Sequence, residues 1–373
     1  MSDFKYLAIV DWARETIKKR GFKPGHKFFS ETELCGIHNV SRQTVRQALT
    51  VMENERLIQR RQGSGTFVLT PGMNTDNRSI TVGVISTYFN DYIFPCIITG
   101  IEQVLVENNM TMRLATTRNL VEEEARTLKT MLAQDVRGLI VEPSKSALPN
   151  PNSALYEEIR MRNIPLVFFN AKYPYSDFPC VAIDDVAAGS IVAEHLISLG
   201  HREISTILLS DDIQGHKRYR GFIESLKKSG IPGAEQRTLW FSTKELPSLF
   251  EFSADRILTL LKDSTAIICY NDSLAVRLLE FCKHRGISVP DELSVVGIDD
   301  SNQARICEIP LTTVRHPQRQ LGECVANVLL EMIANPSYDA EDVLFTPELV
   351  VRDSSAAWDN ELVVRDSVTA RAV

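Results

Sequence analysis

The sequence predicts two folded parts, a small winged helix-turn-helix domain of the α+β class followed by a two-lobed, doubly wound α/β domain. The first seventy residues contain three short helical patterns and then two strand-like runs around a glycine-containing turn. From about Ile80 on, short β-branched runs alternate with helical segments. The chain has 373 residues, which exceeds the roughly 250 to 300 that one hydrophobic core organises.

The two parts differ in charge. Residues 1–70 hold 12 Lys and Arg against 7 Asp and Glu, a formal charge of +5. Since the whole chain has a net charge of −7, the remaining residues carry −12. A basic end on an acidic body is expected where only one domain approaches phosphate groups. The small domain is therefore the candidate for binding nucleic acid.

Composition excludes several other classes. The chain is 44% hydrophobic and 24% charged, and no apolar run approaches the roughly 20 residues of a membrane span. The first residues lack the pattern of a secretory signal, so we expect a cytoplasmic protein. The seven cysteines are scattered without metal-ligand spacing. We expect reduced thiols, no metal and no cofactor.

The small domain begins with three helices. The first helical pattern covers residues 6–17 and ends before a glycine. The second helix starts at Ser30, whose hydroxyl can cap it while Glu33 completes a capping box. Ser41 can cap the third helix, which extends to about Asn54. Three helices in so short a span are expected to pack against one another.

The third helix has two faces of different residue types. Its apolar face comprises Val45, Ala48, Leu49 and Met52, and its polar face comprises Arg42, Gln43, Arg46 and Gln47. Arginine can donate two hydrogen bonds to guanine and glutamine can pair with adenine, while Thr44 can reach a phosphate or a thymine methyl. A solvated helix face is the alternative for such a pattern taken alone. The hairpin that follows favours an interface with DNA.

That hairpin is the expected wing. Two strand-like runs, residues 57–61 and 66–68, enclose the segment Gln62-Gly63-Ser64-Gly65. Its glycines permit close approach of the backbone to DNA, and the residues Arg60, Arg61 and Gln62 supply charge and hydrogen-bond donors.

Residues 4–69 as a whole resemble the DNA-binding domain of the GntR family. The matching motifs are Ser30-Glu31-Thr32-Glu33-Leu34, Val40-Ser41-Arg42-Gln43-Thr44-Val45-Arg46-Gln47-Ala48-Leu49 and Gly63-Ser64-Gly65-Thr66-Phe67-Val68. Phe28-Phe29 departs from the Leu-Pro pair that is common in the family. With the resemblance, operator double-stranded DNA is the expected partner. The expected DNA-contacting residues are Ser30, Glu31, Ser41, Arg42, Gln43, Thr44, Arg46, Gln47, Arg60, Gln62, Gly63, Ser64 and Gly65.

The large domain follows a polar linker that contains Pro71-Gly72. Its β-branched runs are typical of strands that are buried on both faces of a parallel sheet. The expected strands are residues 81–85, 138–141, 166–169, 204–208, 266–269 and 294–298. We expect domains at residues 1–70 and 80–353, a linker at 71–79 and a disordered tail at 354–373.

Polar and aromatic residues follow several of these strands, where ligands bind in doubly wound sheets. They are Glu142, Asn170, Asp184-Asp185, Tyr270-Asn271-Asp272 and Asp299-Asp300, together with Tyr88, Asp91, Tyr92 and Phe94 after the first strand. Carboxylates, amides and aromatic rings are groups that bind sugar hydroxyls. Singly, each polar residue is more often a helix cap than a ligand, but their convergence favours a cleft for a polar ligand.

Residues 80–352 resemble the lac-repressor family and, more distantly, the periplasmic sugar-binding proteins. The matching motifs are Arg218-Tyr219-Arg220-Gly221-Phe222, Tyr270-Asn271-Asp272, the run from Val289 to Asp300 and the run from Leu311 to Pro317. The resemblance implies sugar contacts from Arg218, Asn271 and Asp299, and it places His316 in the cleft.

A GntR-type head on a lac-repressor-type body is the arrangement of the arabinose-responsive repressors. Residues 87–95, 140–148 and 212–215 resemble that family, which adds Lys145 and Gln214 to the site. The resemblance implies a repressor of arabinose or pentose utilisation genes with L-arabinose as effector. We expect a homodimer that binds its operator without sugar and is released from it by L-arabinose. The residues expected at the effector site are Tyr88, Asp91, Tyr92, Phe94, Glu142, Lys145, Asn170, Asp184, Gln214, Arg218, Tyr270, Asn271, Asp299 and His316.

Other functions remain as alternatives. An enzyme is disfavoured because no phosphate-binding loop, GxSxG or HExxH motif is present. A solute-binding transport protein is disfavoured by the missing signal sequence and by the DNA-binding head. An activator or a different sugar effector fits the same residues. One feature has no assigned role: the heptapeptide Glu348–Ser354 recurs at Glu361–Ser367.

Overall fold

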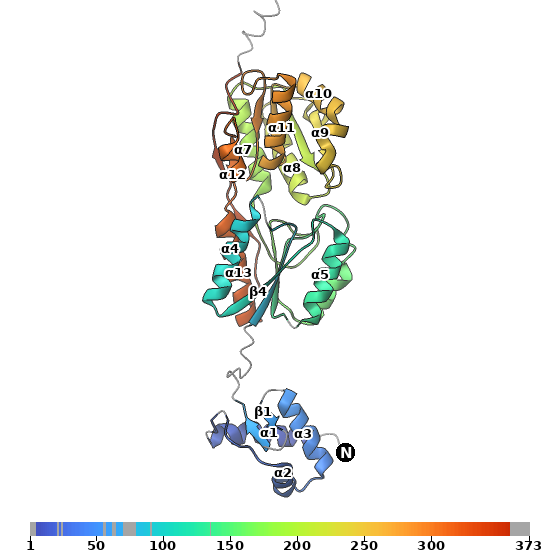
Figure 1. Cartoon of the computed structure of the whole chain (residues 1–373), viewed down its shortest axis with the longest axis vertical. Helices are drawn as coiled ribbons and strands as arrows, with labels where there is room; N and C mark the ends of the chain where they lie inside the picture. The colour runs from blue at the N-terminus through green and yellow to red at the C-terminus, as the bar shows by residue number, and fades with distance from the viewer. Residues whose placement is uncertain are drawn as a thin grey trace, which may run out of the picture. The chain divides into compact units, whose positions relative to one another are not determined.

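A computed structural model describes residues 5–20, 22–23, 25–54, 57–61, 65–69, 80–89, 92–134 and 136–358. The chain divides into two compact units between Arg78 and Ser79, at the carboxyl end of the expected linker (Figure 1).

The small unit contains the three expected helices and a hairpin. They are α1 (Lys5–Lys19), α2 (Glu31–His38), α3 (Arg42–Asn54), and the antiparallel strands β1 (Ile58–Arg61) and β2 (Gly65–Val68). The apolar face of α3 lies in the core, where Val45, Ala48, Leu49 and Met52 are fully buried. This packing leaves the polar face of α3 exposed, as the sequence predicts.

The predicted helix caps are confirmed. The Ser30 hydroxyl accepts a hydrogen bond from the Glu33 backbone at 3.3 Å, and the Glu33 carboxylate accepts one from the Ser30 backbone at 2.8 Å. The Ser41 hydroxyl accepts a hydrogen bond from the Thr44 backbone at 3.3 Å. Both caps fix where α2 and α3 begin, and so they fix the register of the exposed face of α3.

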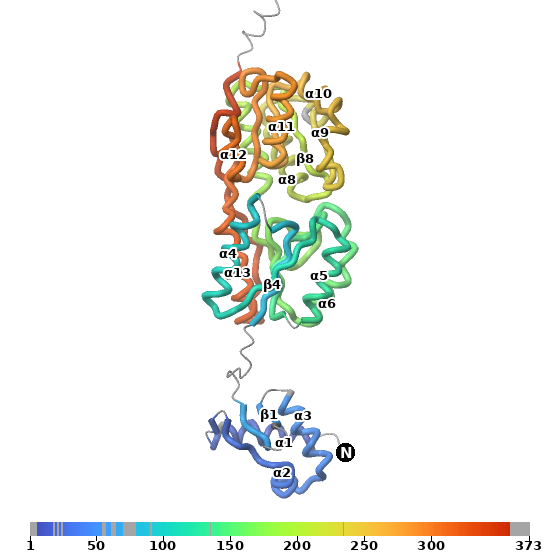
Figure 2. The backbone as a smooth tube through the Cα atoms, in the orientation of Figure 1, coloured from blue at the N-terminus to red at the C-terminus, as the bar shows by residue number. Residues whose placement is uncertain are grey.

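Lobe 1 of the large unit is built on a parallel sheet of six strands in the order β13-β7-β6-β5-β3-β4. The strands are β3 (Ile80–Ser86), β4 (Met110–Thr116), β5 (Gly138–Val141), β6 (Leu166–Phe169), β7 (Cys180–Ile183) and β13 (Val343–Phe345). One face is covered by α4 (Phe94–Glu107) and α13 (Gln318–Ala334), and the other by α5 (Val121–Ala133) and α6 (Ser153–Met161). Although α4 and α13 come from opposite ends of the domain's sequence, they lie side by side (Figure 2).

Lobe 2 contains a parallel sheet of four strands in the order β11-β10-β8-β9. The strands are β8 (Ile204–Leu209), β9 (Thr238–Phe241), β10 (Ala266–Cys269) and β11 (Ser294–Val296). One face is covered by α7 (Asp185–Ser198) and α8 (Ile213–Lys228), and the other by α9 (Leu249–Phe252), α10 (Ala254–Lys262), α11 (Asp272–Arg285) and α12 (Asn302–Ile306). All six strands predicted for the large domain are present, but β4, β7, β9, β13 and the pair described next were not predicted.

The chain passes between the lobes three times, after β7, after β12 (Thr313–Arg315) and after β13. The third crossing leads into β14 (Glu348–Val350), which pairs antiparallel with β12. Each crossing spans only a few residues, so relative movement of the lobes is confined to a hinge.

The expected start of the tail at residue 354 is wrong. The Ser354 side chain is fully buried, donates to the Val295 carbonyl at 2.6 Å and accepts from the Thr312 backbone at 2.8 Å. The Trp358 ring stacks on His201 with 5.8 Å between ring centroids. The domain therefore extends to at least Trp358, because these side chains complete its packing. The remaining tail, including the second heptapeptide, lies outside the described residues.

The approach of α7 to α8 depends on two glycines. A Cβ atom at Gly189 would lie 2.0 Å from the Arg218 carbonyl oxygen, and one at Gly221 would lie 1.9 Å from the Val186 carbonyl oxygen. Both distances are far below van der Waals contact with backbone atoms that are held in a helix. Any side chain at these positions would push the two helices apart.

We predict that Gly189→Ala lowers the free energy of unfolding by about 1 to 3 kcal/mol, because the added methyl group overpacks the contact between the two helices. Urea unfolding followed by circular dichroism measures the change. Gly36→Ala is the control, since a Cβ at Gly36 meets no atom within 4 Å. It should leave stability unchanged or raise it slightly through helix propensity. Equal unfolding midpoints for Gly189→Ala and the wild type would contradict the packing argument.

Candidate effector cleft and DNA interface

A cleft of about 290 Å³ lies where the carboxyl ends of the two parallel sheets face each other. Its walls come from residues that follow β3, β4, β5 and β6 in lobe 1, and β8, β9, β10 and β11 in lobe 2. This is the position at which doubly wound sheets bind ligands. The volume lies near the lower end of the roughly 300 to 1,000 Å³ of ligand pockets, which suits a small molecule.

The structure brings most of the expected effector residues together in this cleft. Ten of them line it: Tyr88, Tyr92, Phe94, Glu142, Asn170, Gln214, Arg218, Tyr270, Asn271 and Asp299. Asp91 lies outside the described residues, and Lys145, Asp184 and His316 do not line the cleft.

The polar wall of lobe 1 is centred on Glu142. Its carboxylate accepts hydrogen bonds from the Thr87 backbone at 2.8 Å and from the Asn170 amide at 2.7 Å. Burial raises the pKa of Glu142 to about 6, although these hydrogen bonds lower it. Because the Asn170 amide nitrogen is held by Glu142, its carbonyl oxygen is fixed in place as an acceptor.

The polar wall of lobe 2 is centred on Arg218. Its guanidinium donates to the Asp185 carboxylate at 2.9 Å and to the Tyr270 carbonyl at 2.5 Å, and lies 3.7 Å from Asp299. It also stacks over the Tyr270 ring at 4.9 Å from the centroid. Although burial lowers the pKa of Arg218, the neighbouring carboxylates raise it further. Arg218 therefore stays charged, and its partners are as deeply buried as it is.

Asp299 joins the two lobes at the base of the cleft. One carboxylate oxygen accepts a hydrogen bond from the Tyr92 hydroxyl, which belongs to lobe 1. Burial raises the pKa of Asp299 to about 7, although Arg218 lowers it. The Tyr92 hydroxyl also accepts a hydrogen bond from the Asp272 backbone at 3.2 Å. Tyr92 is therefore a structural contact between the lobes as well as part of the cleft wall.

Two buried acceptors in the cleft have no hydrogen-bond donor among the residues described. They are Oδ1 of Asn170 in lobe 1 and Oδ1 of Asp299 in lobe 2. Leaving a buried acceptor unsatisfied costs about 1 to 3 kcal/mol, so such atoms indicate a place for a donor from a ligand. The Tyr88 and Phe94 rings, 5.8 Å apart, form an apolar wall beside them. Hydroxyl donors on one side and an apolar face on the other describe the surface of a sugar.

Three expected ligands have other roles. Asp184 accepts hydrogen bonds from the Val186 and Ala187 backbones at 3.0 Å, so it caps α7. It is the next residue, Asp185, that holds Arg218, because adjacent residues at a strand end point in different directions. Placing Asp184 in the cleft is therefore wrong.

Lys145 and His316 also differ from expectation. The Lys145 ammonium points to Asp211 at 4.0 Å rather than into the cleft. His316 is 3% exposed, and burial, together with the charge of Arg218, lowers its pKa to about 3. The ring is thus neutral and packed behind the cleft, where neither nitrogen meets a partner from the part of the chain that the structure describes.

Several lining residues were missed from the sequence. They include Thr87, Asn119, Asp212, Thr243 and Leu246. Asp212 is the third residue after β8, so the rule that ligands lie beyond strand ends identifies it once the residues after that strand are considered. Asn119 and Thr243 follow β4 and β9, the edge strands that the sequence pattern did not reveal.

The described residues among the expected DNA contacts differ in exposure and in partners. Arg42, Gln43 and Gln47 are exposed along α3, and none has a side-chain partner among the described residues. Arg46 forms an ion pair with Glu31 at 3.1 Å, which links α3 to the start of α2. Side chains without partners are available to base edges.

The other expected DNA contacts divide into three groups. The Ser30, Ser41 and Thr44 side chains are occupied in helix caps. In the hairpin, Arg60 pairs with Glu53 at 2.6 Å, and Gly65 has a positive φ of 113°. Gln62, Gly63 and Ser64 lie outside the described residues.

Known protein families match both units. A model of the bacterial regulatory proteins of the gntR family matches residues 5–68, and a periplasmic binding protein-like domain matches residues 193–355. A crystal structure of transcription regulator GntR from Chromobacterium violaceum is 26% identical, with a TM-score of 0.64, over 74% of this chain and 99% of that one.

No helix among the described residues is long and apolar enough to span a lipid bilayer.

Two relatives match almost the whole chain. The arabinose metabolism transcriptional repressor of Geobacillus stearothermophilus is 40% identical over 94% of this chain and 97% of its own length. The protein of the same description from Halalkalibacterium halodurans is 37% identical over 96% of this chain and 98% of its own length. With both domains matched in the same order, the chain belongs to the family of the arabinose metabolism transcriptional repressors.

Proposed function

We propose that this chain is a cytoplasmic transcription repressor that binds operator DNA through α3 and the hairpin, and that L-arabinose in the cleft releases it. The observation that carries the effector assignment is the pair of unsatisfied buried acceptors, Asn170 Oδ1 and Asp299 Oδ1, on opposite lobes of a small cleft. A polyhydroxylated molecule between them donates to both lobes at once. The names of the two relatives support arabinose as that molecule.

The charges in the cleft favour a neutral sugar. Among the described lining residues, three carboxyl groups, Glu142, Asp212 and Asp299, face one guanidinium, Arg218. Because Arg218 is already paired with Asp185, the described lining residues offer no free positive charge to a phosphate or a carboxylate. Sugar phosphates and sugar acids would therefore be repelled.

Regulation follows from lobe closure. A ligand that contacts both lobes stabilises the closed arrangement. The size of the shift toward the closed state equals the difference between the ligand's affinities for the closed and the open state. We propose that closure changes the spacing of the two heads of a homodimer, so that they no longer match two half-sites on DNA. No enzymatic step is needed for this role, so we propose a regulator rather than an enzyme.

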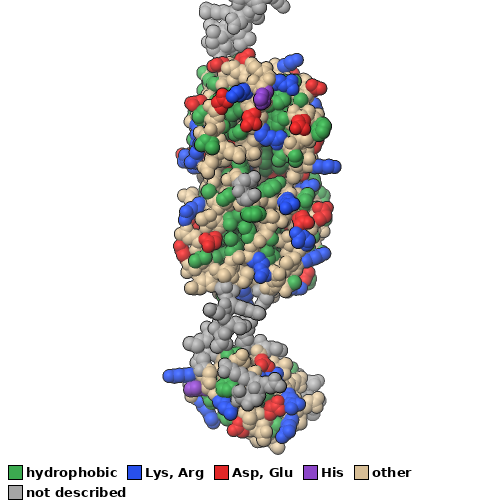
Figure 3. Space-filling view, viewed as in Figure 1, with side chains coloured by type: hydrophobic (Ala, Val, Ile, Leu, Met, Phe, Trp, Pro, Cys, Tyr) green, Lys and Arg blue, Asp and Glu red, His purple; other side chains and the backbone are tan. Residues whose placement is uncertain are grey.

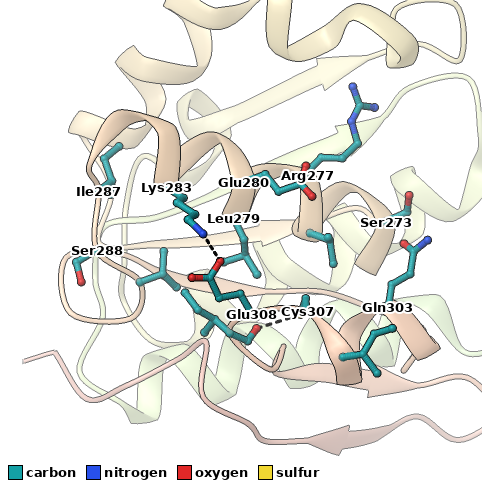
Figure 4. A pocket seen from close by; sticks show the side chains of 14 residues that line it. Ser273, Arg277, Leu279, Glu280, Lys283, Ile287, Ser288, Gln303, Cys307 and Glu308 are labelled. Atoms are coloured by element: carbon teal, nitrogen blue, oxygen red, sulfur yellow. Dashed lines mark hydrogen bonds and ion pairs between the residues drawn. The ribbon is translucent and has the colours of Figure 1, made fainter.

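The surface of lobe 2 supports a homodimer. A groove of about 710 Å³ lies between α11 and α12, and its lining includes apolar side chains such as Leu279 and Ile287 and the Lys283–Glu308 ion pair (Figure 4). Ile306 is 82% exposed beside it. Elsewhere on the visible face of the large unit, basic and acidic side chains are interspersed (Figure 3). An apolar groove that also carries one positive and one negative side chain can pair with the same groove on a second copy of the chain, as in a two-fold symmetric dimer.

The operator titration tests the function. Fluorescence anisotropy of the protein on arabinose-promoter DNA, at fixed salt, is expected to show release by L-arabinose but not by xylose, ribose, galactose or arabinose 5-phosphate. Gln214→Ala should require roughly five- to tenfold more arabinose, because it removes one polar contact in the cleft. Arg220→Ala, on the exposed side of α8, is the control and should respond like the wild type. Binding that ignores every sugar would overturn the effector assignment.

For the head, we predict that Arg42→Ala weakens binding to the operator by about 1 to 3 kcal/mol, because an exposed arginine at the start of α3 is placed to read bases. Competition with unrelated DNA measures the specific part of this loss. Arg14→Ala, which removes a charge from α1, is the control. If Arg42→Ala has no effect at moderate salt, the proposed orientation of α3 on DNA is wrong.

For the dimer, Ile306→Asp is expected to shift the protein toward monomer in analytical ultracentrifugation, because it places a charge in the proposed interface. Operator affinity should fall as the dimer dissociates, because the second DNA-binding head is then no longer held close to the second half-site. Phe252→Asp alters an equally exposed apolar residue, 86% exposed on α9 and outside the groove. It should remain dimeric. A monomeric wild type, or a dimeric Ile306→Asp variant, would refute this interface.

A further inference from the structure

Besides the three hinge crossings and the contact of Tyr92 with Asp299, the lobes are joined at one more place. The loop after β5 in lobe 1 meets the start of α8 in lobe 2, where the Ser146 hydroxyl donates to the Asp212 carboxylate and accepts from the Ile213 backbone at 3.0 Å. The Ala147 backbone also donates to the Asp211 carbonyl at 3.3 Å. These contacts connect backbone and side chains of both lobes.

A second polar contact supports the first. The Asn119 amide donates to the Thr243 hydroxyl across the lobes at 2.8 Å. Its carbonyl oxygen accepts from the Lys145 backbone at 2.6 Å, and the Lys145 ammonium lies 4.0 Å from Asp211. Thr243 in turn donates to Asp211 at 2.9 Å. The loop that carries Ser146 is therefore held in place by the same residues that bridge the lobes.

Ser146 differs from the effector-binding residues in one respect. Its side chain is fully buried in the contact between the lobes, yet it is not among the residues that line the cleft. A hydroxyl that bonds a carboxylate is a charge-assisted hydrogen bond, which is stronger than one between neutral groups. Opening the lobes would break this bond, because its donor and its acceptor belong to different lobes.

We propose that Ser146 and Asn119, with Asp212 and Thr243, form a polar latch that holds the lobes closed and thereby sets effector affinity. Ser146 acts in it as a positioning residue. Because latch and sugar both stabilise the closed state, a weaker latch makes the sugar supply more of the free energy of closure. The effect of the latch on sugar affinity rests on the proposed function, whereas its effect on the distance between the lobes does not.

The test compares two serines of the same loop. Ser144 is also fully buried, but among the described residues its hydroxyl bonds only to Thr117, within lobe 1, at 2.8 Å. Ser146→Ala and Ser144→Ala thus remove the same group from equally buried positions, and only the first crosses the lobes. Both variants should lose some thermal stability, so stability alone does not separate them.

Two measurements on the full chain separate them. Isothermal titration with L-arabinose should give a dissociation constant about tenfold higher for Ser146→Ala and unchanged for Ser144→Ala, as expected for one lost charge-assisted hydrogen bond. Spin labels at two exposed positions, introduced by Met161→Cys on lobe 1 and Phe252→Cys on lobe 2 in a Cys96→Ser background, report the distance between the lobes. Ser146→Ala should shift that distance distribution to longer values.

The outcomes are distinguishable from failure of the proposed function. A wild type that binds no arabinose would refute the effector assignment, and the spin-label distances would still decide on the latch. Distances for Ser146→Ala that match those for Ser144→Ala would overturn the latch, whatever the sugar affinity. A longer distance with a weaker arabinose affinity for Ser146→Ala alone would support it.

Discussion

The large domain is organised around one buried positive charge, the guanidinium of Arg218. Removing a charge from water is costly unless partners surround it, and here Asp185, Asp299 and the Tyr270 carbonyl come from three different elements to do so. The glycines that let α7 and α8 approach place Arg218 beside Asp185. The Asp299 carboxylate also accepts a hydrogen bond from the Tyr92 hydroxyl of lobe 1. The charge cluster in lobe 2 therefore also supports the contact between the lobes.

The sequence predicted the interior of the fold better than its edges. Strands buried on both faces, such as Leu166–Phe169, are continuous apolar runs and were recognised directly. The edge strand β4, Met110–Thr116, is only partly buried, so its pattern is mixed, and β13 and β14 are three residues long. Those short strands are stabilised by partners far away in the sequence, which local periodicity does not contain.

The site was predicted to a similar degree and for a related reason. Residues that follow a recognised strand, such as Glu142, Asn170 and Tyr270, were placed correctly in the cleft, whereas Asn119 and Thr243 follow unrecognised edge strands. The choice between neighbours also needs coordinates, as Asp184 and Asp185 show. His316 and Lys145 were taken from resemblance, but His316 is buried outside the cleft lining and the Lys145 ammonium lies 4.0 Å from Asp211.

Regulation by the sugar requires that the cleft and the DNA-binding head are thermodynamically coupled, and coupling of this kind is reciprocal. The most direct measurement is the dissociation constant of L-arabinose for the protein alone and for the protein saturated with operator DNA. We expect operator DNA to weaken sugar binding by the same factor by which saturating sugar weakens operator binding. Equal sugar affinities with and without DNA would contradict it, since the two sites would then be independent.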